Sequence, residues 1–248
     1  MELGLSGQRF LVSGGTRGIG RAVVEGLLAE GADVAFCARS PEAVAEAQAQ
    51  LSADGGIAFG TVVDVADQPA VADWVASSAE ALGGIDGVVA NVSALSDDWR
   101  SSIDVDLMGT VSLVDAALPH LLATGAGSIV TISSVSGREI DVFAGSYGSI
   151  KAAVIHYTQG LAYQLAGKGV RANTVSPGNT YFPGGVWPSI ERDDPELFAA
   201  SLALNPTGRM ATAQEVANAV VFLSSSAASF VSGTNLVVDG ALTRGVQF

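Results

Sequence analysis

Hydrophobic and polar positions along the chain fall into two alternating patterns. Short runs of β-branched and other apolar residues are separated by longer stretches rich in Ala, Leu and Glu. The short runs are nearly continuous in apolar content, as in strands that are buried on both faces of a parallel sheet. These runs predict strands at residues 9–13, 33–37, 57–63, 87–91, 128–133, 170–175 and 235–238. The longer stretches predict helices at residues 19–30, 41–53, 68–82, 98–123, 146–166 and 213–224.

The alternation of seven strands with about six helices predicts an α/β fold, with a doubly wound (Rossmann) parallel sheet flanked by helices. The sequence shows no internal repeat, low-complexity tract or inter-domain linker, so residues 1–248 are expected to form a single domain. The rhythm breaks once, in residues 177–205, which are rich in Pro, Gly and aromatic residues. Long connections of this kind inside compact domains are usually functional or disordered.

The composition limits which binding partners and which cellular compartment are expected. Of the 248 residues, 48% are hydrophobic and 15% are charged, which is typical of a compact globular protein. The 25 acidic residues exceed the 12 basic ones and give a net charge of −13, so neither nucleic acid nor an anionic membrane is expected as a partner. The single cysteine, Cys37, excludes an internal disulfide framework and indicates a cytoplasmic location.

The sequence also argues against a metal site, a signal peptide and a membrane span. It has no CxxC or HExxH motif and only two histidines, so no metal ion is expected. The N-terminal residues do not form a basic segment followed by an apolar one, as a signal peptide would. The apolar stretches are interrupted by Gly, Ser, Asp or His before they reach membrane-spanning length.

A glycine-rich turn follows the first predicted strand. Its glycines allow the backbone to turn tightly and a pyrophosphate to approach the amides that begin the next helix. The spacing Gly-x-x-x-Gly-x-Gly differs from the Gly-x-Gly-x-x-Gly of many dinucleotide sites, and such a turn can be purely structural. Its place after the first strand of a doubly wound sheet favours a nucleotide site. The predicted cofactor contacts in this turn are Gly14, Thr16, Arg17, Gly18, Ile19 and Gly20.

The end of the second predicted strand indicates which nucleotide binds. A carboxylate there would bind the ribose 2′-hydroxyl of NAD, but the chain has Ala38, followed by Arg39 and Ser40. Two guanidinium groups, those of Arg17 and Arg39, suit the 2′-phosphate of NADP(H) through charge-assisted hydrogen bonds. The alternative is that both arginines are surface residues that aid solubility.

Three polar residues are candidates for catalysis. Tyr147 and Lys151 are four residues apart, so a helix places them on one face, and Ser134 lies thirteen residues upstream of Tyr147. An ammonium group beside a tyrosine stabilises the phenolate, which suits general acid–base chemistry. A Tyr-x-x-x-Lys pair also arises by chance, and the alternative is a surface aromatic beside a solvated lysine.

Six motifs in a fixed order extend these observations over nearly the whole chain. They are the glycine turn at residues 14–20, the pair Asp64 and Val65, the segment at residues 90–93, the set Ser134, Tyr147 and Lys151, the pair Pro177 and Gly178, and the segment at residues 238–240. With these motifs the chain resembles the short-chain dehydrogenases/reductases, particularly their 3-oxoacyl-carrier-protein reductase-like members.

The resemblance implies a hydride-transfer mechanism. Hydride moves between a nicotinamide and a carbonyl carbon, and Tyr147 gives or takes the proton. Tyr147 and Lys151 are both expected to contact the cofactor, the lysine through a hydrogen bond to the ribose. Ser134 positions the substrate oxygen. The resemblance also implies the remaining cofactor contacts, which are Asp64 and Val65 at the adenine, Asn91 after the fourth strand, and Pro177, Gly178 and Thr180 at the nicotinamide.

One departure from the family concerns the proton relay. The family's fourth catalytic residue is an asparagine, and Asp106 replaces it within residues 105–109. An aspartate can hold the water that this asparagine holds, or, when ionised, it can pair with Lys151 and weaken the effect of the lysine on Tyr147. The alternative is that Asp106 satisfies backbone groups at a helix irregularity.

A second departure concerns the cofactor phosphates. Val92 and Ser93 follow Asn91 where the family has smaller residues, and Phe182 stands where a threonine that contacts the phosphates is common. Cofactor binding is therefore expected to be looser on that side.

The resemblance assigns a substrate lid to residues at about 179–205. Aromatic residues in this lid favour an apolar or aromatic ketone or alcohol as substrate. The alternative is that they pack the lid onto the core, which we prefer for Phe198. The predicted pocket residues are Asp141 and Phe143 at the entrance and Tyr181, Phe182 and Trp187 in the lid.

Three functions remain open on the sequence alone. The first is an NADP(H)-dependent carbonyl reductase or alcohol dehydrogenase acting on a small molecule. The second is a non-catalytic nucleotide-binding sensor, and the third is an NAD-dependent catabolic alcohol dehydrogenase, which Ala38 disfavours. The resemblance further implies a homotetramer assembled through the helices at residues 98–123 and 146–166 and through residues 243–248.

Overall fold

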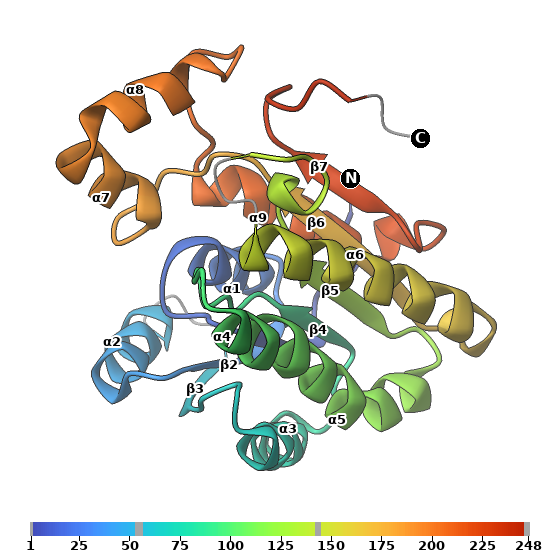
Figure 1. Cartoon of the computed structure of the whole chain (residues 1–248). Coiled ribbons are helices and arrows are strands. Elements are labelled where there is room, and N and C mark those ends of the chain that lie inside the picture. Colours follow the sequence, from blue (N-terminus) through green and yellow to red (C-terminus); the bar gives the residue numbers. More distant parts are fainter. Residues whose placement is uncertain (1, 53–56, 142–144, 246–248) are drawn as a thin grey trace.

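The fold is a seven-stranded parallel sheet, seen in a computed structural model that describes residues 2–52, 57–141 and 145–245 (Figure 1). The strand order is β3-β2-β1-β4-β5-β6-β7, so successive strands are added on one side of β1 up to β3 and on its other side from β4 onward, as in a doubly wound sheet. The fold class predicted from the sequence is confirmed, and the predicted strand ends are displaced by only one or two residues. The strands are β1 (Arg9–Ser13), β2 (Asp33–Ala38), β3 (Ala58–Val62), β4 (Gly87–Ala90), β5 (Ser128–Ile132), β6 (Arg171–Pro177) and β7 (Asn235–Val238).

Helices cover both faces of the sheet (Figure 1). One face is buried beneath α1 (Gly18–Ala29), α2 (Pro41–Ser52) and α9 (Ala213–Ser224), and the other beneath α3 (Gln68–Leu82), α5 (Gly109–Thr124) and α6 (Ser146–Leu165). Because the apolar strand residues are buried on both faces, each strand reads as a continuous apolar run.

The helix predicted at residues 98–123 is not a single α-helix. It begins with α4 (Trp99–Ser101), continues as a π-helix at Ser102–Met108 and becomes α5 at Gly109. A π-helix differs from an α-helix in its backbone hydrogen bonds and not in the residue types that form it. Residue composition therefore did not distinguish this segment from an α-helix. The consequence is local, because Asp106 lies within the π-helical segment.

The segment after β6 contains two helices that the sequence analysis did not assign. They are α7 (Val186–Asp193) and α8 (Pro195–Ala203). Asp194 caps α8, since its side chain accepts a hydrogen bond from the Leu197 amide at 3.0 Å, and Pro195 occupies the first turn. An Asp-Pro pair is a recognised signal for a helix start, so α8 could have been predicted from the sequence.

Candidate active site

The predicted site residues gather at the carboxyl edge of the sheet. The glycine turn follows β1, Asn91 follows β4, Ser134 follows β5, and Gly178 follows β6. The carboxyl ends of parallel strands share one edge, and ligands of doubly wound sheets bind where the strand order reverses. The structure therefore brings residues from distant parts of the chain to one edge of the sheet, at the ends of the adjacent strands β1, β4, β5 and β6.

The glycine turn has the geometry of an anion site. Gly14 and Gly18 have φ values of +73° and +57°, which disfavour residues with a side chain. A Cβ at Gly20 would collide with the carbonyl oxygen of Gly14, so α1 begins directly against the turn. Arg17 occupies the N-cap position in an extended conformation, and within the described residues no side chain caps this helix start. The first amides of α1 are thus available to a phosphate.

Asn91 ties the end of β4 to the glycine turn. Its side-chain amide donates to the carbonyl oxygens of Ser13 at 3.1 Å and Gly14 at 3.4 Å, and its backbone amide donates to Ser13 Oγ at 3.0 Å. Three hydrogen bonds of this kind fix the shape of the turn. The predicted cofactor residue Asn91 therefore has a clear supporting role for the phosphate site.

Cys37 supports the turn from β2. Its carbonyl oxygen accepts hydrogen bonds from the Gly14 and Gly15 amides at 2.8 and 3.2 Å. Its thiol is buried, and desolvation raises its pKa to about 12, which keeps the thiol protonated and unreactive. We therefore expect a thiol-labelling reagent to leave the native protein unmodified and to modify it fully after unfolding in urea, as measured by mass spectrometry. Rapid labelling of the native protein would contradict this placement.

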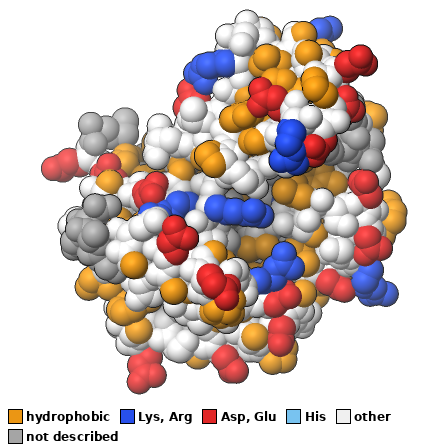
Figure 2. Space-filling model, turned by 90° about the vertical axis from the view of Figure 1, so that its left-hand side faces the viewer, with side chains coloured by type: hydrophobic (Ala, Val, Ile, Leu, Met, Phe, Trp, Pro, Cys, Tyr) orange, Lys and Arg blue, Asp and Glu red, His pale blue; other side chains and the backbone are white. Residues whose placement is uncertain are grey.

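Four predicted cofactor contacts, of which Arg39 was expected to select NADP(H), lie after β2 and β3. Arg39 is exposed, and Ser40 caps α2 by accepting a hydrogen bond from the Ala43 amide at 3.2 Å. Asp64 is exposed after β3, whereas Val65 is buried against Gly109 of α5. Figure 2, which views the molecule from the side of α2, α7 and α8, shows Lys and Arg side chains bordering a hollow near the middle of that face.

The segment predicted as a substrate lid, at about residues 179–205, contacts the glycine turn directly. A Cβ at Gly18 would lie 2.5 Å from the Phe182 ring, so this ring lies over the start of α1. The Arg17 guanidinium donates to the carbonyl oxygen of Gly184 at 3.2 Å. Phe182, at a position where the family commonly has a phosphate-binding threonine, thus packs against the turn that is suited to a phosphate.

Other lid aromatics pack on one another. The Phe198 ring is edge-on to Tyr181 and Trp187, with ring centroids 6.2 and 6.4 Å apart. Trp187 is buried, and the Tyr181 hydroxyl donates to Glu191 at 2.5 Å, which raises the pKa of Tyr181. Phe198 is half-buried and packs on two rings of its own segment, whereas its expected packing onto the core stays a prediction. The same packing involves Tyr181 and Trp187, so these two rings give less support to an apolar substrate than the sequence suggested.

The nicotinamide side of the predicted site is rigidly held. The Gly178 amide donates to the carbonyl oxygen of Val238 at 3.0 Å, and a Cβ at Gly178 would lie 2.7 Å from the Asp239 side chain. Thr180 is buried, its hydroxyl donates to the carbonyl oxygen of Gly178 at 3.0 Å, and it forms a β-bridge with Ala211. The turn from Pro177 to Thr180 is thereby fixed at the sheet edge.

Tyr147 and Lys151 share a face of α6, as the spacing predicts. The Lys151 ammonium lies 5.7 Å from the centre of the Tyr147 ring. The lysine is buried and also donates to the carbonyl oxygen of Ile132 at 3.1 Å. The alternative of a solvated lysine on the protein surface is wrong, because α6 presses this residue against the end of β5.

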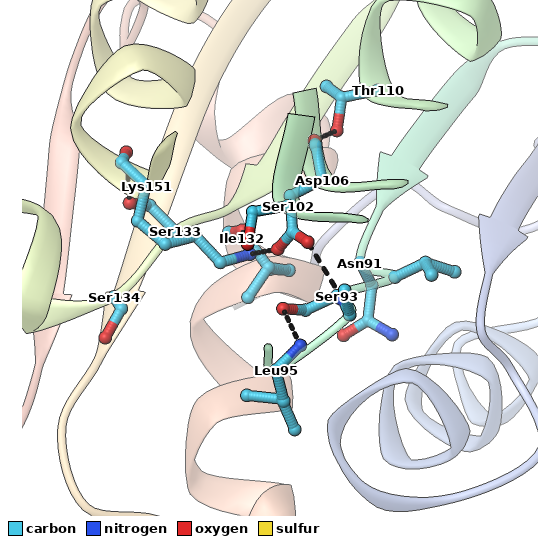
Figure 3. Close-up of polar contacts among 12 residues, drawn as sticks. Asn91, Ser93, Leu95, Ser102, Asp106, Thr110, Ile132, Ser133, Ser134 and Lys151 are labelled. Atoms are coloured by element: carbon cyan, nitrogen blue, oxygen red, sulfur yellow. Dashed lines mark hydrogen bonds and ion pairs between the residues drawn. The ribbon is translucent and has the colours of Figure 1, made fainter. Parts of the chain in front are cut away.

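Asp106 forms a buried ion pair with Lys151 (Figure 3). Its Oδ1 atom lies 3.0 Å from Lys151 Nζ, and the side chains are 2% and 3% exposed, respectively. Its Oδ2 atom accepts a hydrogen bond from the Ala94 amide at 2.8 Å. Asp106 therefore forms the ion pair with Lys151 that the sequence analysis considered. It also satisfies a backbone amide from within a π-helix, which was the alternative role.

Ser134 is part of a hydroxyl cluster that the sequence analysis did not foresee. Its Oγ atom accepts a hydrogen bond from the Ser136 amide and donates to Ser136 Oγ, both at 3.2 Å. The neighbouring Ser133 hydroxyl donates to the carbonyl oxygen of Lys151 at 2.8 Å and anchors α6 to the end of β5. The density of serines at residues 133–136 was visible in the sequence and was the available signal.

Asp141 and Phe143 were predicted to line the entrance of the substrate pocket. Asp141 accepts a hydrogen bond from the Ser136 hydroxyl at 2.6 Å, which places it beside the Ser134 cluster. Phe143 lies outside the described residues. Across residues 2–52, 57–141 and 145–245, no cluster of three or more His, Cys, Asp or Glu side chains is arranged to hold a metal ion.

Helix amides that can bind a phosphate, together with Ser134, Tyr147 and Lys151 at the same sheet edge, define a dinucleotide-dependent oxidoreductase. A family model described as Enoyl-(Acyl carrier protein) reductase matches residues 14–243. Isoepoxydon dehydrogenase patN of Penicillium expansum is 41% identical over 257 residues, covering 100% of this chain and 99% of that protein. The chain belongs to the short-chain dehydrogenase/reductase family.

Solved structures of similar proteins agree with this assignment. L-Sorbose reductase from Gluconobacter frateurii, complexed with NADPH and L-sorbose, has a TM-score of 0.92 and 27% identity, covering 99% of this chain and 100% of that one. A short-chain oxidoreductase from Pseudomonas aeruginosa PAO1, solved with NADPH and described as containing an atypical catalytic centre, has a TM-score of 0.90 and 29% identity. It covers 98% of this chain and 99% of its own.

Proposed function

We propose that the protein is an NADP(H)-dependent carbonyl reductase or alcohol dehydrogenase for a small molecule. The observation that carries this proposal is that the Lys151 ammonium is buried and lies 5.7 Å from the centre of the Tyr147 ring. Both residues lie at the sheet edge that also holds Ser134. Such a set suits proton exchange with a carbonyl or alcohol oxygen. The intact set argues against a non-catalytic sensor.

The residues at this edge fit a nicotinamide dinucleotide. The amides that begin α1 suit its pyrophosphate, and the end of β2 offers Arg39 and Ser40 instead of a carboxylate. The predicted contacts Asp64, Asn91 and Thr180 lie at strand ends on the same edge. When bound, the cofactor supplies or accepts the hydride. Two of the similar proteins were solved with NADPH, which supports NADP(H) over NAD.

The chain's own residues provide the proton chemistry. In reduction, the Tyr147 hydroxyl gives its proton to the substrate oxygen, and in oxidation the phenolate takes it back. Lys151 stabilises the phenolate through its charge. Asp106 and the carbonyl oxygen of Ile132 hold the lysine in place. The Ser134 hydroxyl turns to donate a hydrogen bond to the substrate oxygen as negative charge develops there.

Cofactor preference gives one test of this proposal. NADP⁺ is expected to raise the melting temperature of the protein more than NAD⁺ at equal concentration, because ligand binding stabilises the folded state. Arg39→Asp removes a positive charge from the end of β2, so it is expected to lower the NADP⁺ to NAD⁺ preference by about 10- to 100-fold, the scale of a charge-assisted hydrogen bond.

Lys168→Asp is the matched control for Arg39→Asp. It changes the net charge equally at an exposed position beyond the end of α6 that is far from Tyr147. The control is expected to keep the preference for NADP⁺. A clear preference of the parent protein for NAD⁺ would show that Arg17 and Arg39 do not select the cofactor, and it would favour the NAD-dependent alternative.

The homotetramer and the cytoplasmic location also remain proposals. The sequence analysis expected no apolar stretch of membrane-spanning length, but among the described residues one continuous helical segment, Trp99–Thr124, is apolar and long enough, with a mean hydropathy of 1.3 and 33% of its window buried. A single helix of this kind is weak evidence for a membrane. Covering by further copies of the chain accounts for it equally well, and Tyr163 of α6 is 91% exposed. Sedimentation velocity distinguishes a tetramer from a monomer, and cell fractionation tests the location.

A further inference from the structure

A groove lies between α6 and the segment that leads into β7, and none of the predicted site residues lines it. Its volume is about 580 Å³, which is within the range of small-molecule sites. Residues of α6 form one wall and residues at the start of β7 form the other. Its polar lining consists of Arg138, His156, Gln159, Thr234 and Asn235.

The chemistry of this lining suits an anion. The groove has no carboxylate, and its two ionisable side chains, Arg138 and His156, are both basic. Gln159 and Thr234 add an amide and a hydroxyl that can donate hydrogen bonds. Since the whole chain has 25 acidic residues against 12 basic ones, a groove with only basic ionisable groups is an electrostatic exception on this protein.

Arg138 carries a positive charge that the described residues leave unpaired. Its Nη1 atom is buried without a hydrogen-bond partner, and no carboxylate within residues 2–52, 57–141 and 145–245 forms an ion pair with it. An arginine stays charged and offers five donors in a planar fork that matches an oxyanion. Burying part of such a group without a partner costs free energy, which a bound oxyanion would offset.

Asn235 presents a further donor from the opposite wall. Its Oδ1 atom accepts a hydrogen bond from Ser176 Oγ at 2.7 Å, which fixes the orientation of the side-chain amide. Among the described residues, its Nδ2 atom has no acceptor. The groove therefore combines a guanidinium, an imidazole and an oriented amide, and a carboxylate or phosphate can accept from all three kinds of donor.

The groove also adjoins the backbone of the catalytic residues. A Cβ at Gly137 would lie 2.8 Å from the carbonyl carbon of Lys151 and from the amide nitrogen of Ala152. The turn that follows Ser134 therefore presses against α6 at the catalytic lysine, and His156 lies about one helical turn beyond this contact. A ligand in the groove would touch both of these elements from outside the candidate active site.

We propose that this groove is a second ligand site, which binds the carboxylate or phosphate group of a small molecule through Arg138, His156 and Asn235. The site is separate from the predicted cofactor and substrate positions. It does not depend on the proposed carbonyl reductase function, because its ligand takes no part in hydride or proton transfer.

Nuclear magnetic resonance of protein with isotope-labelled histidine tests the site, because the chain has only two histidines. His156 borders the groove, and His120 lies at a different surface, beside Arg9 and Asp86, so it is an internal reference. Sodium phosphate and sodium acetate each replace sodium chloride at constant pH and ionic strength, with NADP⁺ present to fill the cofactor site. At least one anion is expected to shift the His156 resonances saturably and to leave those of His120 in place.

Arg138→Gln removes the charge and is expected to weaken anion binding at least about tenfold, the scale of a lost charge-assisted hydrogen bond. Arg100→Gln, at an arginine whose side chain is 80% exposed on α4, is the matched control and is expected to keep the affinity within about twofold. The spectra report on the groove in whichever assembly the protein forms in solution.

Two results would overturn the proposal. One is the absence of a saturable His156 shift with either anion in the parent protein, and the other is an unchanged affinity in Arg138→Gln. Should Arg138→Gln fail to fold, Gln159→Glu introduces a carboxylate at an exposed position of α6 and is expected to weaken binding by a similar factor through like-charge repulsion. Unchanged anion binding in that variant also overturns the proposal.

Discussion

Tyr147→Phe is expected to lower kcat for ketone reduction by about 10²- to 10⁴-fold, the usual contribution of a positioned general acid. The substitution removes the proton donor and leaves the ring on α6, with the Lys151 ammonium at its side. NADP⁺ is still expected to raise the melting temperature of the variant, because the phosphate and adenine contacts lie on other elements. Steady-state kinetics with NADPH and thermal unfolding with NADP⁺ measure the two effects.

Tyr163→Phe is a control on the same helix. Tyr163 lies near the other end of α6 and is 91% exposed, so loss of its hydroxyl is expected to leave kcat within about twofold of the parent. If Tyr147→Phe reduced ketones as fast as the parent protein, Tyr147 would not be the proton donor and the mechanism would have to be reassigned.

Lys151→Met is expected to cost about 3–5 kcal/mol of unfolding free energy, because it leaves the Asp106 carboxylate buried without its partner. The same substitution is expected to cost less in an Asp106→Asn background, where no buried charge remains to be paired. Urea unfolding of the parent, the two single variants and the double variant gives the coupling free energy of the pair. Activity is expected to stay low in both variants that lack Lys151, since neither has an ammonium beside Tyr147.

An exposed ion pair provides the control for this cycle. Arg192 and Asp193 lie 2.7 Å apart with side chains 71% and 63% exposed, so Arg192→Met is expected to change the unfolding free energy by less than about 1 kcal/mol. If the effects of Lys151→Met and Asp106→Asn were simply additive, the buried pair would contribute no coupling. The assignment of Asp106 as the residue that positions Lys151 would then fail.

The fold was predictable because its pattern is local. A strand buried on both faces must be apolar at nearly every position, and this composition identified all seven strands. The π-helix at Ser102–Met108 was not predictable in the same way, because it changes backbone hydrogen bonds and not composition. The position of Asp106 opposite Lys151 follows from this irregular segment and from its packing against α6.

The site was predictable only in part. Spacing placed Tyr147 and Lys151 on one helical face, and the order of motifs placed Ser134 near them. The contacts of Ser133 with the backbone of α6 and of Ser136 with Asp141 depend on how the end of β5 meets other segments, which spacing does not specify. Aromatic composition also failed to separate pocket from packing in the lid, because a ring can serve either purpose until its neighbours are known.

The central claim is that hydride moves between the nicotinamide and a carbonyl carbon at this sheet edge. The most direct measurement uses NADPH carrying deuterium at the transferable position of the nicotinamide and a ketone that the parent protein reduces. Mass spectrometry of the alcohol product then locates the deuterium. The account predicts one deuterium on the carbinol carbon and no labelled product from Tyr147→Phe on the same timescale. Turnover of a ketone by the parent protein without deuterium in the alcohol would contradict the account.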